Sequence, residues 1–203
     1  MKTLVLVRHG ETEWNSDRRI QGSVDVPLSE VGLAQAAALA HDLAEQGFRI
    51  DRIFTSDLQR SRETGRIIAD RLGVAEVSEN RLLRELHCGE WEGRLIDDLR
   101  ENERELYETW LDDPAFAIPG GESVLQLRER VQRFFEGEKA ELDRHKRVLV
   151  VAHGLINRMF LSVLLKLDPQ RSRYFSQDNT AIDVFSWRGD RIYCDVWNLT
   201  CHL

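Results

Sequence analysis

Two histidines in this chain each follow an apolar run and precede a glycine. His9 ends the run LVLVRHG, and His153 ends the run VLVVAHG. A neutral imidazole can act as a nucleophile, a proton carrier or a metal ligand. If the two runs are parallel strands, both imidazoles emerge at the same edge of the sheet, where α/β proteins bind their ligands. Either histidine alone would favour an ordinary strand end, but the repetition favours a site.

Two arginines are expected at the same edge. Arg8 directly precedes His9, and Arg60 falls in the first turn of a helix that Ser56 is expected to cap. A guanidinium can hold two phosphoryl oxygens at once, and a helix N-terminus also favours an anion. Arg60 could instead be a solvated surface residue, but its place directly behind the cap singles it out. Two adjacent cations should lower the pKa of His9 and leave it neutral near pH 7.

The elements that must position these residues alternate between short apolar runs and longer amphipathic ones. Strands are expected at 3–7, 52–56, 74–78, 147–152, 180–187 and 191–198, the last two as a hairpin; helices are expected at 29–46, 56–73, 95–110, 123–135 and 155–167. Ser56 with Gln59, and Ser123 with Gln126, have capping-box spacing. This order predicts an α/β fold, a three-layer α/β/α sandwich with a mostly parallel central sheet.

Composition narrows the class of protein. A chain of 203 residues with 42% hydrophobic and 31% charged residues predicts one domain over 1–203, with a mostly helical excursion at about 86–121 over the active site. The net charge of −7 argues against nucleic acid or an anionic membrane as partner, and no segment has the length of a signal or a membrane span. Three cysteines are too few for a disulfide framework, which favours a reducing cytoplasm. Dimers are common enough that a homodimer is also expected.

Five stretches along the chain resemble, in order, the motifs of the histidine phosphatase superfamily, in its phosphoglycerate-mutase-like branch. They are LVRHGETEWN, SDLQRSRET, LRELHCGEWEG, PGGES and VVAHG. The resemblance implies that His9 accepts a phosphoryl group and that Glu85 protonates the leaving alkoxide and then deprotonates water. It also implies that Arg8, Arg60 and His153 surround the phosphoryl oxygens.

Further residues are expected around the substrate. The resemblance implies secondary phosphate contacts from Asn15, Gln21 and Gly22, although a polar loop after a strand explains these residues nearly as well. His87 is expected on the leaving-group side together with aromatic residues of the excursion. Aromatic residues in such an excursion more often pack among themselves. The residues expected to line the leaving-group side of the pocket are His87, Trp91, Tyr107 and Trp110.

A metal site remains an alternative for the same residues. His9, His153 and Glu85 could form a set of two histidines and one carboxylate. Arg8 argues against it, because a fixed cation beside a divalent ion is repulsive unless an anionic substrate bridges them. The prediction is therefore a metal-independent enzyme without a cofactor, acting on a small phosphorylated metabolite.

The resemblance leaves mutase and phosphatase to be separated. The mutases of the family have an arginine directly after the acid, a longer insertion with paired arginines, and a tail over the site. Here Leu86 follows Glu85, the only adjacent arginines are Arg18 and Arg19, and the chain ends soon after its last strand. These differences favour a phosphomonoester hydrolase, with phosphoglycerate mutase as the alternative.

The substrate is less constrained. Candidate subtypes are broad-specificity phosphatases, α-ribazole phosphatases and phosphoserine phosphatases, but the last have a histidine where this chain has Cys88. An inactive phosphate-binding or interaction domain is the alternative of another class. All five residues that the resemblance implies for catalysis are present, which argues against that alternative; they are Arg8, His9, Arg60, Glu85 and His153.

Overall fold

A six-stranded sheet forms the centre of the computed structural model, which describes residues 2–203 and leaves Met1 outside the described residues. The strand order is β3-β2-β4-β1-β5-β6. The four strands from β3 to β1 are parallel, β5 pairs antiparallel to β1, and β6 pairs antiparallel to β5 to complete a hairpin. The strands are β1 Thr3–Arg8, β2 Arg52–Thr55, β3 Val77–Glu79, β4 Arg147–Ala152, β5 Ile182–Arg188 and β6 Arg191–Leu199. The mostly parallel sheet confirms the prediction.

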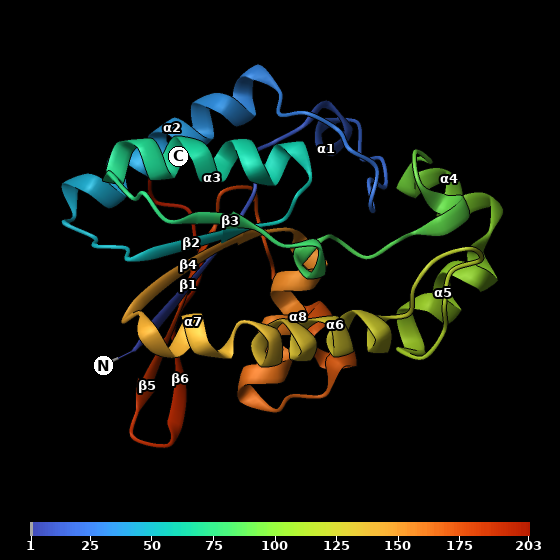
Figure 1. The fold of residues 1–203 in the computed structure, drawn as a ribbon. Helices are drawn as coiled ribbons and strands as arrows, with labels where there is room; N and C mark the ends of the chain where they lie inside the picture. Colours follow the sequence, from blue (N-terminus) through green and yellow to red (C-terminus); the bar gives the residue numbers. More distant parts are fainter. Residues whose placement is uncertain (1) are drawn as a thin grey trace.

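Helices cover both faces of this sheet (Figure 1). The helices are α1 Glu13–Ser16, α2 Glu30–Glu45, α3 Gln59–Leu72, α4 Ile96–Asn102, α5 Arg104–Asp112, α6 Val124–Gly137, α7 Lys139–Arg144 and α8 Gly154–Leu165. Short 3-10 turns lie at η1 Arg81–Leu83, η2 Gly89–Trp91 and η3 Pro169–Tyr174. Helices α2 and α3 cover one face, whereas α6, α7 and α8 cover the other (Figure 1). The three-layer sandwich is therefore confirmed.

The alternation of side chains along β1 explains why the strand is apolar throughout. Val5 and Val7 point into the core that α2 and α3 close, whereas Leu4 and Leu6 point into the core beneath α6 and α8. All four side chains are buried. A strand covered on both faces has no polar side, which is why its first polar residues mark its end.

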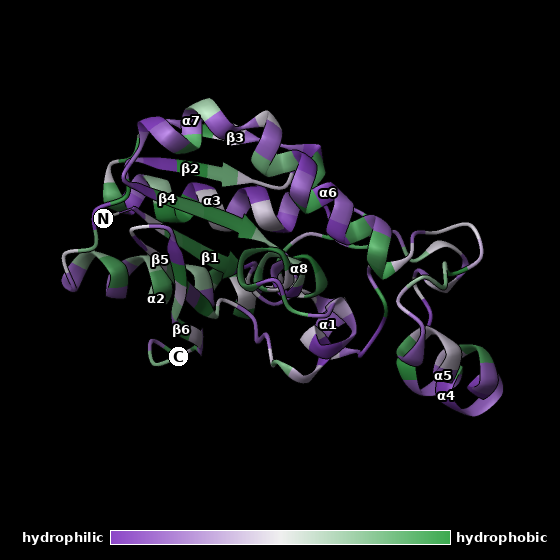
Figure 2. Cartoon of the chain, turned by 90° about the horizontal axis from the view of Figure 1, so that it is seen from below, coloured by the Kyte–Doolittle hydropathy of each residue, from purple (hydrophilic) through white to green (hydrophobic). Residues whose placement is uncertain are grey.

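The register between β1 and β4 brings the two histidines to one edge. Val7 pairs with Val151 and Arg8 pairs with Ala152 in parallel register. His9 and His153 are the next residues along their strands, so they leave the sheet side by side. Figure 2 shows β1 and β4 directed toward α8 and α1, with α4 and α5 lying further out on the same side.

The start of α3 differs from the prediction. The helix begins at Gln59, and Ser56 is not its cap, because the Ser56 hydroxyl instead accepts from the Leu58 N–H at 3.3 Å. The Gln59 N–H donates to the carboxylate of Asp25 at 2.6 Å. A side chain distant in the sequence therefore takes over the capping function that local spacing had assigned to Ser56. The capping box of Ser123 is confirmed.

The predicted helix over 95–110 is two helices, α4 and α5. The break lies at Glu103, whose backbone is non-helical at φ −130° and ψ 39°. The Glu103 carboxylate accepts from the indole N–H of Trp91 at 3.2 Å and from the guanidinium of Arg94. These contacts to residues upstream of α4 hold the chain where the helical pattern alone would continue it.

Within residues 2–203, no helix combines the length and the apolar character needed to cross a membrane.

Candidate active site

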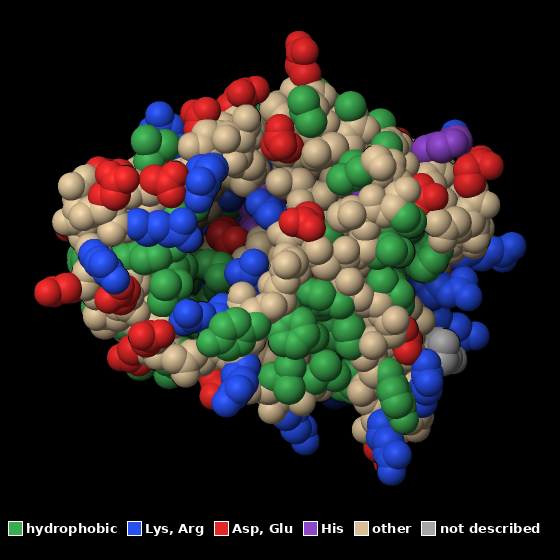
Figure 3. All heavy atoms as spheres, turned by 180° about the vertical axis from the view of Figure 1, so that it is seen from behind, with side chains coloured by type: hydrophobic (Ala, Val, Ile, Leu, Met, Phe, Trp, Pro, Cys, Tyr) green, Lys and Arg blue, Asp and Glu red, His purple; other side chains and the backbone are tan. Residues whose placement is uncertain are grey.

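A pocket of about 280 Å³ opens beyond the carboxyl ends of β1 and β4. Figure 3 shows a hollow on this face, with basic side chains around its rim and apolar side chains along its wall. Seven of the nine residues predicted from the sequence line the pocket: Arg8, His9, Asn15, Gln21, Gly22, Arg60 and Glu85. The exceptions are His153, which lies behind His9, and His87.

His9 is buried and held in one tautomer. Its Nδ1 lies 2.6 Å from the carbonyl oxygen of Gly10, which can only accept a hydrogen bond. Nδ1 therefore carries the proton in the neutral ring, and Nε2 keeps its lone pair. Burial lowers the pKa of His9 well below its ordinary value, and the positive charges of Arg60 and Arg8 lower it further. His9 is therefore neutral at physiological pH, and the lone pair on Nε2 could act as a nucleophile.

His153 lies directly against His9. The two ring centroids are 5.0 Å apart, with the ring planes at 61°. His153 is fully buried, and neither of its ring nitrogens has a hydrogen-bond partner among residues 2–203. Burial lowers its pKa well below the ordinary value, and the charges of Arg60 and His9 contribute in the same direction. A buried polar group without a partner is costly, so both nitrogens keep unused hydrogen-bonding capacity beside His9.

Arg8 and Arg60 are fixed by backbone carbonyls rather than by carboxylates. Arg60 donates to Val24 O at 2.7 Å and to Gly22 O at 2.9 Å, and Arg8 donates to Gln177 O. In both residues the Nε is buried without an acceptor among residues 2–203. Burial lowers the pKa of Arg60 to about 10, which leaves it charged at neutral pH. Two positive charges therefore face the pocket without a neutralising partner.

Glu85 is held at the N-terminus of α8. Its carboxylate accepts from the backbone N–H groups of Leu86 at 2.9 Å, Leu155 at 3.0 Å and Ile156 at 3.2 Å. The backbone carbonyl of Glu85 accepts from Arg130 at 2.9 Å. The structure thus fixes the carboxyl group within the same pocket as His9 from both its side chain and its main chain.

Sequence reasoning missed Arg130. Its guanidinium also donates to the carbonyls of Leu82 and Arg84 and forms a bidentate pair with Glu122. It therefore clamps the segment that carries the proposed acid against α6. Glu122 belongs to the PGGES stretch, but nothing in local spacing relates it to Glu85.

The two glycines of the His-Gly pairs have different reasons to be there. A Cβ on Gly10 would lie 2.4 Å from the carbonyl oxygen of Gly32, so the first turn of α2 excludes any side chain at this position. A Cβ on Gly154 would meet Arg8 and Glu85 at 3.8 Å, which is ordinary contact. The expected close approach is therefore a property of Gly10, whereas Gly154 is the first residue of α8.

Of the four residues predicted to contact the substrate outside the catalytic set, three line the pocket and one does not. Asn15, Gln21 and Gly22 line the pocket, and the side-chain oxygen of Gln21 is buried without a partner among residues 2–203. His87 does not line the pocket. Its backbone N–H donates to Glu122 at 3.0 Å, and its neighbours Cys88 and Trp91 line the pocket instead. His87 is therefore not one of the residues of the proposed site.

The aromatic residues expected on the leaving-group side line the pocket and also pack on one another. The rings of Trp91, Tyr107 and Trp110 pack on one another, with centroids 5.8 to 6.1 Å apart, and all three also line the pocket. Packing and pocket lining therefore coexist. Additional lining residues are Arg19, Ile20, Cys88, Ile96, Ile118, Gly154, Leu155, Arg158 and Gln177. Helical spacing from Gly154 could have indicated Arg158, four residues further along α8.

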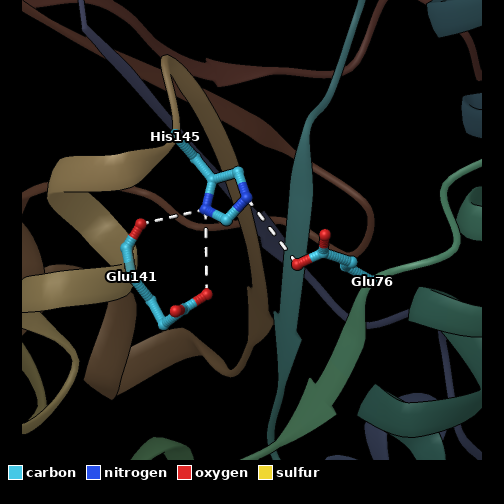
Figure 4. A group of neighbouring side chains, drawn as sticks. All are labelled: Glu76, Glu141 and His145. Carbon is cyan, nitrogen blue, oxygen red and sulfur yellow. Dashed lines mark hydrogen bonds and ion pairs between the residues drawn. The ribbon is translucent and has the colours of Figure 1, made fainter.

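A second group of titratable residues lies at the opposite end of the sheet. His145 lies between Glu141 and Glu76, and the three residues offer ligand atoms within 4.8 Å of one another (Figure 4). Arg144 and Arg52 pair with these carboxylates at 3.7 to 3.9 Å. Because two cations already occupy the acidic groups, the geometry fits an ion-pair network that joins α7 to the start of β3.

The pocket itself suits an oxyanion better than a divalent cation. Nδ1 of His9 is engaged by Gly10, both oxygens of Glu85 accept backbone N–H groups, and two unpaired guanidiniums lie beside them. Fixed positive charges repel a metal ion and attract a phosphoryl group.

Comparisons with known proteins agree with this geometry. The probable phosphoglycerate mutase GpmB of Serratia proteamaculans is 39% identical over 183 residues, which cover 90% of this chain and 83% of that protein. Phosphoserine phosphatase 1 of Hydrogenobacter thermophilus is 34% identical over 204 residues, covering 100% of this chain and 95% of that protein.

A solved structure of a mycobacterial glucosyl-3-phosphoglycerate phosphatase in complex with VO3 superposes with a TM-score of 0.86 at 29% identity, over 98% of this chain and 99% of that one. The model of the histidine phosphatase superfamily (branch 1) matches residues 4–200. With this match over nearly the whole sequence, and with paired histidines between unpaired arginines at the sheet edge, the chain belongs to the histidine phosphatase superfamily.

Proposed function

We propose that this protein is a metal-independent phosphomonoester hydrolase that acts on a small phosphorylated metabolite through a phosphohistidine, within one domain over residues 1–203. The observation that carries the proposal is the state of His9. It is neutral, its Nδ1 donates to Gly10, and its free Nε2 lies in a pocket with the unpaired guanidiniums of Arg8 and Arg60.

In the first step, Nε2 of His9 attacks the phosphorus in line with the ester oxygen. The N–P bond forms as the P–O bond to the leaving group breaks, and Glu85 gives its proton to the leaving alkoxide. Arg8, Arg60 and His153 stabilise the charge on the transferring oxygens, which is the principal contribution that a protein makes to phosphoryl transfer.

In the second step, a water molecule takes the place of the leaving alcohol. Glu85 now accepts a proton from the water, whose oxygen attacks phosphorus while the N–P bond breaks. Inorganic phosphate leaves, His9 returns to its neutral form, and Glu85 is again protonated. Glu85 thus regains in the second step the proton that it gave in the first, and no other proton donor or acceptor is needed.

Phosphoglycerate mutase is the second candidate, because a relative of 39% identity carries that name. A mutase must keep water out until the phosphoryl group returns to the second substrate. Leu86 stands where the mutases have an arginine, and the pocket opens to solvent on the face of Figure 3. These features support hydrolysis.

The test is turnover of a generic aryl phosphate by the purified protein in excess EDTA. We expect full activity in EDTA, inhibition by vanadate, and loss of both activity and acid-labile phosphorylation in His9→Ala. A strict requirement for a divalent metal, or unchanged turnover in His9→Ala, would overturn the mechanism and support the metal-dependent alternative. Absence of turnover in every assay would support the inactive phosphate-binding domain.

A second assay separates the two enzymatic candidates. The protein is supplied with 3-phosphoglycerate and 2,3-bisphosphoglycerate, and both inorganic phosphate and 2-phosphoglycerate are followed. Release of phosphate is expected. Rapid formation of 2-phosphoglycerate would make the protein a mutase.

A further inference from the structure

The pocket is lined by an arginine that has no ion-pair partner among residues 2–203. Arg158 projects from α8 into the pocket, and it forms neither a hydrogen bond nor an ion pair with the rest of residues 2–203. Its Nε is buried. Burial lowers the pKa of Arg158, and the negative charges of Glu85 and Asp178 oppose that effect. A guanidinium is otherwise one of the most readily paired groups in a protein.

Another residue that lines this pocket, and a smaller pocket beside it, also has a donor without an acceptor. The indole Nε1 of Trp110 is buried without a partner among residues 2–203, and Trp110 lines the pocket together with Arg158 and Leu155. By contrast, the indole of Trp91 in the same aromatic group donates to Glu103 at 3.2 Å. Unsatisfied buried donors each cost stability, so two of them in one pocket indicate a ligand rich in acceptors.

The charges in the pocket define that ligand more closely. Arg8, Arg60 and Arg158 form no ion pair within residues 2–203, whereas Arg19 pairs with Asp17 at 3.2 Å. When Glu85 carries its proton for catalysis, a phosphoryl dianion neutralises two of the three unpaired cations. One arginine then remains without an ion-pair partner among residues 2–203, because Asp178 acts on Arg158 only from beyond ion-pair distance, and a further negative charge on the substrate would pair with it.

Arg158 comes from α8, the helix whose first residues donate backbone N–H groups to the carboxylate of Glu85. The charge of Arg158 lowers the pKa of Arg8, but the charges that lower the pKa of His9 are those of Arg60 and Arg8. In an α-helix, residues four apart lie on the same face, so Arg158 lies one turn beyond Gly154. This places the remaining cation near Glu85, where the leaving group must be.

We propose that Arg158 and the indole N–H of Trp110 bind a carboxylate on the leaving group, so that the preferred substrates are short phosphorylated carboxylic acids. This inference rests on the proposed phosphatase function. Arg158 is then a specificity-determining residue: it selects among phosphomonoesters, while Arg8 and Arg60 bind the phosphoryl group that all of them share. The apolar wall of Trp91, Tyr107 and Ile118 would cover the short carbon skeleton.

The test uses substrate pairs that differ in the carboxylate. One pair is 3-phosphoglycerate and glycerol 3-phosphate; the other is O-phosphoserine and O-phosphoethanolamine. We measure kcat/KM for each and take the ratio of the carboxylated to the uncarboxylated member. In the wild-type protein this ratio should be at least about 10, the value of one charge-assisted hydrogen bond that is made only with the carboxylate.

The variants are chosen to separate selection from general damage. Arg158→Gln should bring the ratio to about 1, Arg158→Lys should recover part of it, and Trp110→Phe should lower it several-fold. Arg133→Gln is the control, because Arg133 is an exposed arginine of α6 and its loss changes the net charge equally. The ratio in that control should equal the wild-type ratio.

Two outcomes for this ratio would contradict the inference. A wild-type ratio near 1, or an Arg158→Gln protein that loses the same factor on both members of each pair, would show that Arg158 serves the phosphoryl group or the fold. Hydrolysis of the aryl phosphate in either case would leave the proposed function intact. Calorimetric binding of 3-phosphoglycerate and glycerol 3-phosphate to His9→Gln, with and without Arg158→Gln, gives the same ratio without turnover, so failure of catalysis does not prevent the test.

Discussion

Strand β4 has a histidine at each end, and the two lie in opposite electrostatic surroundings. His145 precedes the strand and lies between two carboxylates, Glu141 at 3.9 Å and Glu76 at 3.7 Å, which arginines also pair. His153 follows the strand, fully buried, with both ring nitrogens unpartnered and with Arg60 and Arg8 lowering its pKa after burial itself. At the amino end of the strand each charge meets its opposite, whereas at the carboxyl end the cations stay unpaired.

The difference follows from the topology of the sheet. Beyond the carboxyl ends of parallel strands the following helices begin, and their N–H groups and dipoles add to the positive side chains. Such an arrangement is unfavourable in the empty protein and is relieved by an anion. Complete pairing at the other end stabilises the fold but leaves nothing to bind a ligand. The same residue type therefore serves structure at one end and is placed for chemistry at the other.

The largest effect is expected when Glu85, in the pocket at the carboxyl end of the sheet, is compared with Glu141, which lies beside His145 at the other end. Glu85→Gln should lower kcat for an alkyl phosphate by roughly 10³-fold, because the leaving alkoxide loses its proton donor. The loss should be much smaller for p-nitrophenyl phosphate, whose leaving group departs without a proton. Glu141→Gln is the matched control and should keep wild-type kcat. Equal losses on both substrates would assign Glu85 a role in positioning only.

The next effect compares the histidines themselves. His153→Gln should lower kcat/KM by about 10²-fold, because one group that stabilises the transferring oxygens is lost from the site. His145→Gln should keep kcat/KM within about twofold while losing up to about 1 kcal/mol of unfolding free energy, since exposed ion pairs contribute little. Steady-state kinetics and urea denaturation measure the two quantities. A catalytic defect in His145→Gln would remove the functional contrast between the ends of β4.

Anion binding should show which end of the sheet carries uncompensated charge. Inorganic phosphate at 100 times its dissociation constant should raise the unfolding free energy by about 2.7 kcal/mol, because it binds only the folded protein. Chloride at equal ionic strength should weaken the screened pairs around His145 without this gain. The stabilisation should be sharply reduced in Arg60→Gln. Equal stabilisation of Arg60→Gln and the wild type would locate phosphate binding elsewhere.

The smallest effect concerns acid stability. The folded pKa values of His9 and His153 lie well below 6.5, so the unfolded chain binds these protons first as the pH falls. Each histidine should therefore remove roughly 1 kcal/mol of stability per pH unit below about 6.5, down to its folded pKa, and none above that window. Between pH 6.5 and 5.5, His153→Gln should lose about that much less stability than the wild type. Denaturation curves with the same slope against pH for both proteins would contradict the burial of a neutral His153.

Parts of the site were predictable because they depend on local pattern. An apolar strand that ends in Arg-His-Gly marks its own end, and the repeat at His153 predicted that the two rings meet, as the 5.0 Å centroid distance shows. The first turn of α3 was predicted correctly for Arg60, although its cap was not. Ser56 had the right spacing, but Asp25 takes the Gln59 N–H because a loop distant in sequence lies against the helix.

Other parts depend on contacts that no local pattern contains. The break at Glu103 arises from its bonds to Trp91 and Arg94, and His87, whose backbone N–H donates to Glu122, is not among the residues that line the pocket. Arg158 carries no signal apart from its helical spacing, since a single arginine on an amphipathic helix is normally solvated. What distinguishes Arg158 is that it has no partner among residues 2–203. Only the tertiary structure shows this, because it depends on which residues surround the side chain.

The sequence by itself determined the α/β class, the residues at the carboxyl edge of the sheet and the membership of a phosphoryl-transfer family, because strand periodicity and short motifs are local properties of a chain. Only the tertiary structure decided which charges are paired and which are left unpaired. That distinction depends on distances between residues far apart in sequence, such as Arg60 with Gly22, Glu85 with the start of α8, and Arg158 with no partner among residues 2–203. Burial then sets the free-energy cost of each unpaired group, and so its readiness to bind a ligand.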